Sequence, residues 1–165
     1  MDWWRVMSVL TLIGIDPGLV HTGVVMIKID TIKNVYRVEH KIVESDNPAE
    51  TAAWVRRHDV SNQAYIYIEK YLDRGTVFNT HSRMRVFEQE LKRALPTAKL
   101  VDNTGAKKIV TRELMELLDV WKFPTTNHRD LQAAARIALF GALKDTGLNR
   151  VLYNLTIKLL ERSTP

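Results

Sequence analysis

The stretch TLIGIDPGLVHTGVVMI, residues 11–27, holds two apolar runs separated by a short polar turn. Asp16 ends the first run and is followed at once by a Pro-Gly pair, which is typical of a tight turn. Two apolar runs with so short a connection predict neighbouring antiparallel strands over residues 12–15 and 23–29. A carboxylate in that place either caps the turn or belongs to a site that residues from elsewhere in the chain complete.

The rest of the sequence predicts further strands and helices of an α/β fold. Alternating, β-branched and aromatic residues predict strands over residues 35–43 and 64–72, and a short run predicts another over residues 98–103. Apolar periodicity and flanking Pro, Asn and Gly residues predict helices over residues 48–58, 76–94, 106–121, 128–144 and 148–162. Because helices precede the last two strands, right-handed crossovers make those strands parallel to their neighbours. We therefore expect a five-stranded mixed sheet, three antiparallel strands and then two parallel ones, with helices on both faces.

The composition limits the classes of protein and of site. A chain of 165 residues suits a single domain over residues 1–165, with residues 1–9 as an N-terminal extension and residues 148–165 as an extra C-terminal helix. The absence of cysteine excludes disulfides and thiolate metal sites. The sequence has no apolar run long enough for a membrane span and no signal-peptide pattern at its start, so we expect a cytoplasmic protein. A net charge of +5 favours a polyanionic partner.

Three carboxylates that are distant in the sequence are candidates for one site. Glu69 lies within an apolar strand, where a charge is costly to bury without a partner. Asp130 lies in the first turn of a predicted helix that Asn127 would cap, and there its charge favours the helix dipole. Each acid alone has such an ordinary structural explanation. If the first and fourth strands are neighbours, however, the three acids meet at one edge of the sheet, and like charges that close need a cation, here Mg²⁺ or Mn²⁺.

Three motifs in this order resemble those of the RuvC-type Holliday-junction resolvases of the RNase H-like superfamily. They are GIDPG followed by TG (residues 14–23), the acid in YIEKY, and HRD leading into an alanine-rich helix. The resemblance covers about residues 10–143 and is closest to the shorter forms that bacteriophages encode, which implies the cytoplasm of a bacterial host. It implies an RNase H-like fold and a homodimeric endonuclease that cuts four-way and other branched DNA with two Mg²⁺ ions, Mn²⁺ being a substitute. No membrane and no small-molecule cofactor is expected.

The resemblance also implies roles for individual residues. Asp16, Glu69 and Asp130 match three of the family's metal ligands. The fourth ligand of the family, an Asp or His, stands three residues before the last acid, where this sequence has Asn127. Either the amide oxygen of Asn127 or the adjacent His128 is then the fourth ligand. A family lysine near the scissile phosphate matches Lys107 or Lys108.

The region before and within the predicted helix over residues 76–94 is basic, and we expect it to contact DNA phosphates through Arg74, Arg83 and Arg85, together with Lys107 and Lys108. A solvated helix face is the ordinary alternative. Because Asn127 departs from the family pattern, a non-catalytic module that binds branched DNA is a second reading. A third is a nuclease for flaps, forks or RNA–DNA hybrids. GIDPG also resembles the phosphate loop of actin-like ATPases, but those need a far longer chain.

Overall fold

The computed structural model describes residues 9–72, 78–145 and 147–165, and within α2 it describes no side chains for residues 78–80. The strands are β1 (Val9–Asp16), β2 (Thr22–Asp30), β3 (Val35–Val43), β4 (Tyr65–Glu69) and β5 (Lys99–Val101). The helices are α1 (Pro48–His58), α2 (Phe78–Ala94), α3 (Ala106–Ile109), α4 (Arg112–Leu117), α5 (His128–Lys144) and α6 (Asn149–Ser163). In the described part of the chain, no helix has the length and apolar character that crossing a membrane requires.

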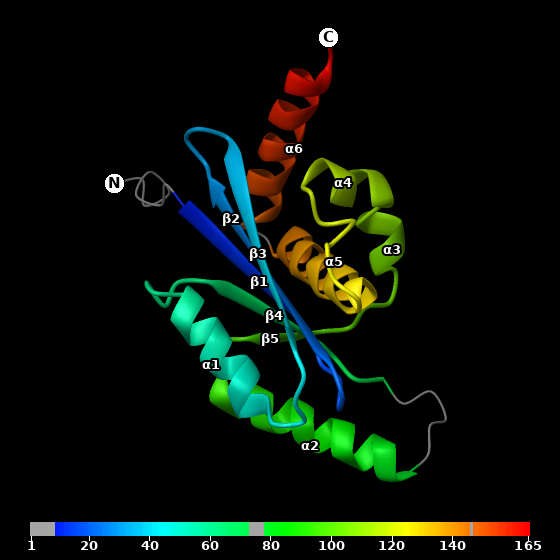
Figure 1. The fold of residues 1–165 in the computed structure, drawn as a ribbon. Coiled ribbons are helices and arrows are strands. Elements are labelled where there is room, and N and C mark those ends of the chain that lie inside the picture. Colours follow the sequence, from blue (N-terminus) through cyan, green and yellow to red (C-terminus); the bar gives the residue numbers. More distant parts are fainter. Residues whose placement is uncertain (1–8, 73–77, 146) are drawn as a thin grey trace.

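All five strands form one mixed sheet in the order β3-β2-β1-β4-β5 (Figure 1). β1 pairs antiparallel with β2, and β2 pairs antiparallel with β3. β4 is parallel to both β1 and β5. The predicted fold class is therefore confirmed, and the condition that the first and fourth strands are neighbours is met. β4 and β5 are shorter than expected, because the chain leaves the sheet directly after Glu69 and Val101.

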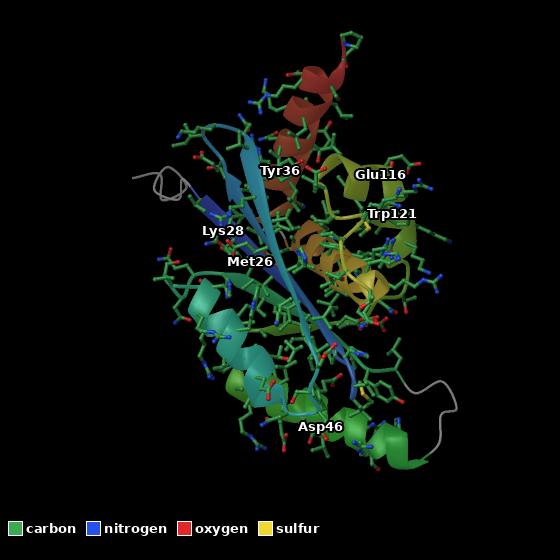
Figure 2. The ribbon with its side chains drawn as sticks, viewed as in Figure 1. Met26, Lys28, Tyr36, Asp46, Glu116 and Trp121 are labelled. Carbon is green, nitrogen blue, oxygen red and sulfur yellow. The ribbon has the colours of Figure 1, made fainter. Side chains whose placement is uncertain are left out.

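The alternation of side chains along the strands divides the core between the two faces of the sheet. Leu12 packs with α5 on one face, whereas Ile13 packs on the other face with α1 and α2. Figure 1 shows α5 on one side of the sheet and α1 and α2 on the other. Figure 2 shows the side chains in the same view, including Tyr36 of β3, whose hydroxyl donates hydrogen bonds to the Leu117 carbonyl at 3.1 Å and to Asp119 at 2.6 Å.

The prediction of one helix over residues 106–121 is wrong. The structure has two short helices there, α3 and α4, because Val110 and Thr111 leave the helical conformation. Thr111 is the N-cap of α4, and its hydroxyl accepts a hydrogen bond from the Leu114 amide at 3.3 Å. The side chain of a threonine at an N-cap satisfies an amide that would otherwise lack a partner, so this local hydrogen bond starts a new helix. At the N-terminus, residue 9 of the predicted extension already belongs to β1.

Candidate active site

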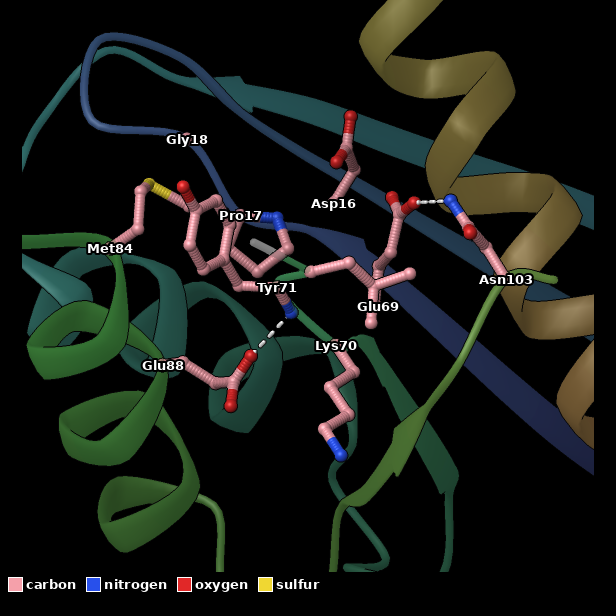
Figure 3. A pocket seen from close by; sticks show the side chains of 10 residues that line it. Asp16, Pro17, Gly18, Glu69, Lys70, Tyr71, Met84, Glu88 and Asn103 are labelled. Carbon is pink, nitrogen blue, oxygen red and sulfur yellow. Dashed lines mark hydrogen bonds between the residues drawn. The ribbon is translucent and has the colours of Figure 1, made fainter. Parts of the chain in front are cut away.

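Asp16 and Glu69 lie side by side at the carboxyl ends of two parallel strands. Ile15 pairs with Ile68, so the next residue of each strand projects from the same face of the sheet, towards α5 (Figure 3). Burial raises the pKa of Asp16 to about 9, and the neighbouring carboxyl groups of Glu69 and Asp130 add to this effect. At neutral pH the buried Asp16 carboxyl group of the metal-free protein therefore keeps its proton.

Asp130 reaches these acids because α5 packs very closely on β1 and β2. Gly23 is the β2 partner of Asp16, and a Cβ atom there would stand 2.4 Å from the carbonyl oxygen of Asp130. A Cβ atom at Gly14 of β1 would stand 1.8 Å from the carbonyl oxygen of Ala134. Only residues without a side chain allow contact this close between a strand and a helix. Two glycines of the quoted stretch thus set the position of the third acid.

The three predicted acids therefore lie at one edge of the sheet, but their side chains are not arranged as a complete metal site. No three His, Asp or Glu side chains in the described ranges are arranged closely enough to hold a metal ion. Asp16 and Glu69 nevertheless fit a divalent cation, because such an ion can replace the proton that the buried Asp16 carboxyl group holds. Their oxygen atoms are the donors that Mg²⁺ and Mn²⁺ prefer.

Asn103 is a residue of this site that the sequence did not reveal. Its amide nitrogen donates a hydrogen bond to Oε1 of Glu69 (Figure 3). Asn103 follows β5, whose Val101 pairs with Glu69, so the ends of β4 and β5 bring the two side chains together. The signal was available, since a polar pair directly after a strand that neighbours β4 must lie at the same edge of the sheet.

A cavity of about 350 Å³ opens between the two acids and α2. Asp16, Glu69 and Asn103 line one side of it, and Met84 and Glu88 of α2 line the other (Figure 3). Glu88 accepts a hydrogen bond from the backbone amide of Tyr71 at 2.6 Å. This bond ties the chain that leaves β4 to α2, and so fixes the wall of the cavity.

The two candidates for the fourth ligand, Asn127 and His128, lie at the start of α5. Asn127 occupies the N-cap position of α5, but its side chain makes no capping hydrogen bond, so the expected cap is wrong in this respect. Asn127 is half-buried and His128 is exposed. The roles of Asn127 and His128 as metal ligands stay predictions.

The predicted DNA-contacting residues lie at the surface. Lys107 and Lys108 are exposed on α3, and Arg83 and Arg85 are exposed on α2. Arg83 lies 3.8 Å from Asp46. Arg74 lies outside the described residues. Within the described part of the chain, these basic side chains have no ion pair with the three acids.

Arg136 of α5 is a second residue that sequence reasoning missed. Burial lowers the pKa of its guanidinium, and the negative charge of Glu69 opposes this effect. Arg136 is thus a basic group close to Glu69, and the roles of Lys107 and Lys108 stay predictions.

No protein-family model and no curated protein matches this sequence. Two solved structures of RuvC from Thermus thermophilus are similar to it. The first, RuvC in complex with a Holliday junction substrate, has a TM-score of 0.55 and 15% sequence identity, over 79% of this chain and 91% of that chain. The second, RuvC alone, has a TM-score of 0.54 and 14% identity, over 84% of this chain and 98% of that chain. This chain has the RNase H-like fold of RuvC. The closeness to phage-encoded forms stays a prediction.

Proposed function

We propose that this protein is a divalent-metal-dependent endonuclease that cuts Holliday junctions and other branched DNA. The observation that carries the proposal is that Asp16 and Glu69 lie side by side, with the charge of Asp130 close by, at the carboxyl edge of a RuvC-like sheet. Acids whose burial and mutual repulsion raise a pKa this far are typical of functional sites, because a purely structural role gives no reason to bury them together. One of the similar RuvC structures is a complex with a Holliday junction, which supports the choice of substrate.

In this proposal Asp16, Glu69 and Asp130 hold Mg²⁺, with Asn127 or His128 as a further ligand. The bound ions supply Lewis acidity and an activated water for hydrolysis of the phosphodiester. The protein contributes rigid positions for the ligands: strand ends fix Asp16 and Glu69, and close packing on Gly23 fixes Asp130. Preorganised ligands of this kind avoid reorganisation when the substrate binds.

Asn103 has a positioning role in the same proposal. Its amide donates to Oε1 of Glu69 and so holds the orientation of a carboxylate that would bind the ion. Such hydrogen bonds to metal ligands commonly raise metal affinity. A lysine of α3, either Lys107 or Lys108, would stabilise the charge that develops on the phosphate during cleavage.

The partner in this proposal is branched DNA. The net charge of +5 and the basic residues predicted from the sequence would provide phosphate contacts that do not depend on DNA sequence. These residues are Arg74, Arg83, Arg85, Lys107 and Lys108. Because a four-way junction has near two-fold symmetry and must be cut twice, the proposal includes a homodimer that presents two sites.

A second candidate is a non-catalytic module that binds branched DNA. Two observations favour it: Asn127 stands where an acid or histidine is expected, and no group of three acids in the described residues is close enough to hold a metal ion. A module of this kind would bind junctions equally well with and without Mg²⁺ and would leave them intact.

The test uses labelled four-way, Y-shaped and linear DNA and an RNA–DNA hybrid, each incubated with Mg²⁺ and the wild-type protein. We expect symmetric nicks in the four-way junction and little cutting of linear duplex. The matched control is Asp16→Asn, which keeps the shape of the side chain and should bind the junction without cutting it. Equal cutting of all substrates would exclude junction resolution, and binding without cutting by the wild type would favour the second candidate.

A further inference from the structure

Arg136 of α5 lies close enough to Glu69 for their charges to interact, yet no ion pair joins the two in the described residues. Its side chain is half-buried, and its Nε atom is buried with no hydrogen-bond partner in the region that the structure describes. Arginine beside a carboxylate usually forms a two-pronged ion pair. Glu69 instead accepts a hydrogen bond from Asn103, and the ion pairs of the described residues do not include Arg136. Because no carboxylate of the described residues forms an ion pair with Arg136, its guanidinium can bind another anion.

The place of Arg136 on α5 suits an anion bound at the acids. It lies six residues after Asp130, about 9 Å farther along the helix axis at 1.5 Å per residue. Arg129 lies seven residues before Arg136, nearly two full turns, so both arginines are on the same side of α5. Arg129 is exposed, whereas Arg136 is half-buried and therefore less screened by salt. Asp130 lies about 120° around the helix from Arg136, so α5 presents Asp130 on one side and, on an adjoining side, the arginine whose charge interacts with Glu69.

We propose that Arg136 binds a phosphate of the DNA strand held at the acids. This inference rests on the proposed function. Three carboxylates repel a phosphodiester, and a nearby guanidinium offsets that repulsion while its planar fork matches the oxygens of a phosphate. The group bound is a backbone phosphate, since the arginine donates only and the acids beside it would act on the same strand. Arg136 is thereby a binding residue of the same site.

The test measures binding of a fluorescein-labelled four-way junction between about 0.05 and 0.3 M salt. All proteins carry Asp16→Asn, so that the junction stays intact. We expect Arg136→Gln to make the negative slope of log K against log salt less steep by about 1. Binding should also weaken about eightfold at about 0.1 M salt, as the loss of one phosphate contact predicts. Arg136→Lys keeps the positive charge but loses the planar fork of the guanidinium. It should therefore keep most of the salt dependence of the parent, and its loss of junction affinity should be about half of the loss caused by Arg136→Gln.

The matched control is Arg150→Gln, which removes the same charge from an exposed position on α6. It should leave the slope within error of the parent. A second readout is the affinity for Mn²⁺ alone, measured for the wild type and for the single variant Arg136→Gln, both of which keep Asp16. This affinity should be the same for the two proteins. Thermal melts check that each variant is folded.

The outcomes separate this inference from the proposed function. If the parent protein does not bind the junction, the proposed function is wrong. If the parent binds and Arg136→Gln leaves the slope unchanged, only the role of Arg136 is wrong. Loss of Mn²⁺ affinity in Arg136→Gln with an unchanged slope would overturn the inference too, because Arg136 would then act through Glu69 and not through DNA.

Discussion

Substitution of Gly23 by alanine tests how closely α5 must pack to place Asp130. The new Cβ atom would stand 2.4 Å from the Asp130 carbonyl oxygen, whereas ordinary contact begins near 3.4 Å, so the start of α5 must move by about 1 Å. A displacement of this size in a reacting group can lower a rate about 100-fold. Overpacking of this kind should also cost about 1–3 kcal/mol of unfolding free energy.

The assay compares the single-turnover cleavage rate, junction affinity and unfolding free energy of Gly23→Ala with those of the wild type. We expect a cleavage rate about 100-fold lower with junction affinity within about twofold, because the phosphate contacts lie on other residues. Gly147→Ala is the matched control, since a Cβ atom there would have nothing within 4 Å and should leave the cleavage rate unchanged. A folded Gly23→Ala protein that cleaves at the wild-type rate would refute the positioning of Asp130 by Gly23.

Three further predictions follow from single side chains. Because the pKa of Asp16 is raised from 3.8 to about 9 in the folded protein, the metal-free protein binds an extra proton when folded, and its stability should fall as the pH rises from about 4 to 9. Asp16→Asn should remove this dependence of the unfolding free energy on pH, and should raise the unfolding free energy by about 1–3 kcal/mol at pH 7.5 in EDTA. Urea unfolding at several pH values measures both effects, and an unchanged pH dependence would contradict the prediction. Asn103→Ala should lower Mn²⁺ affinity about 10–100-fold, measured by titration calorimetry, through loss of its bond to Glu69, and wild-type affinity would rule out that role. Tyr36→Phe should cost about 1 kcal/mol of stability through loss of the bond to Asp119 and leave cleavage unchanged, and a loss of cleavage would show that β3 affects the site.

The sheet could be predicted from the sequence because its signals are local. The apolar run that ends at Asp16 and the short connections fixed the antiparallel strands, and intervening helices required the parallel ones. The convergence of Asp16 and Glu69 followed from the strand order alone. The break at Thr111 escaped prediction because one side-chain hydrogen bond decides between one helix and two.

The parts of the site that the sequence did not reveal depend on packing between distant elements. Asn103 acts on Glu69 only because β5 pairs with β4, and Arg136 nears Glu69 only because α5 crosses the sheet. The motif glycines were visible, but the reason for Gly23 is the backbone of Asp130, more than a hundred residues away. Periodicity contains no information on such close approaches.

Calorimetric titration of the wild-type protein with Mn²⁺ at pH 7, in two buffers of different ionisation enthalpy, tests most directly whether the buried carboxyl pair is a cation site. Binding should release about one proton per protein, because a bound ion would displace the proton that Asp16 holds, and Asp16→Asn should abolish both the binding and the release. Tight binding without proton release, or equal binding by Asp16→Asn, would contradict the account.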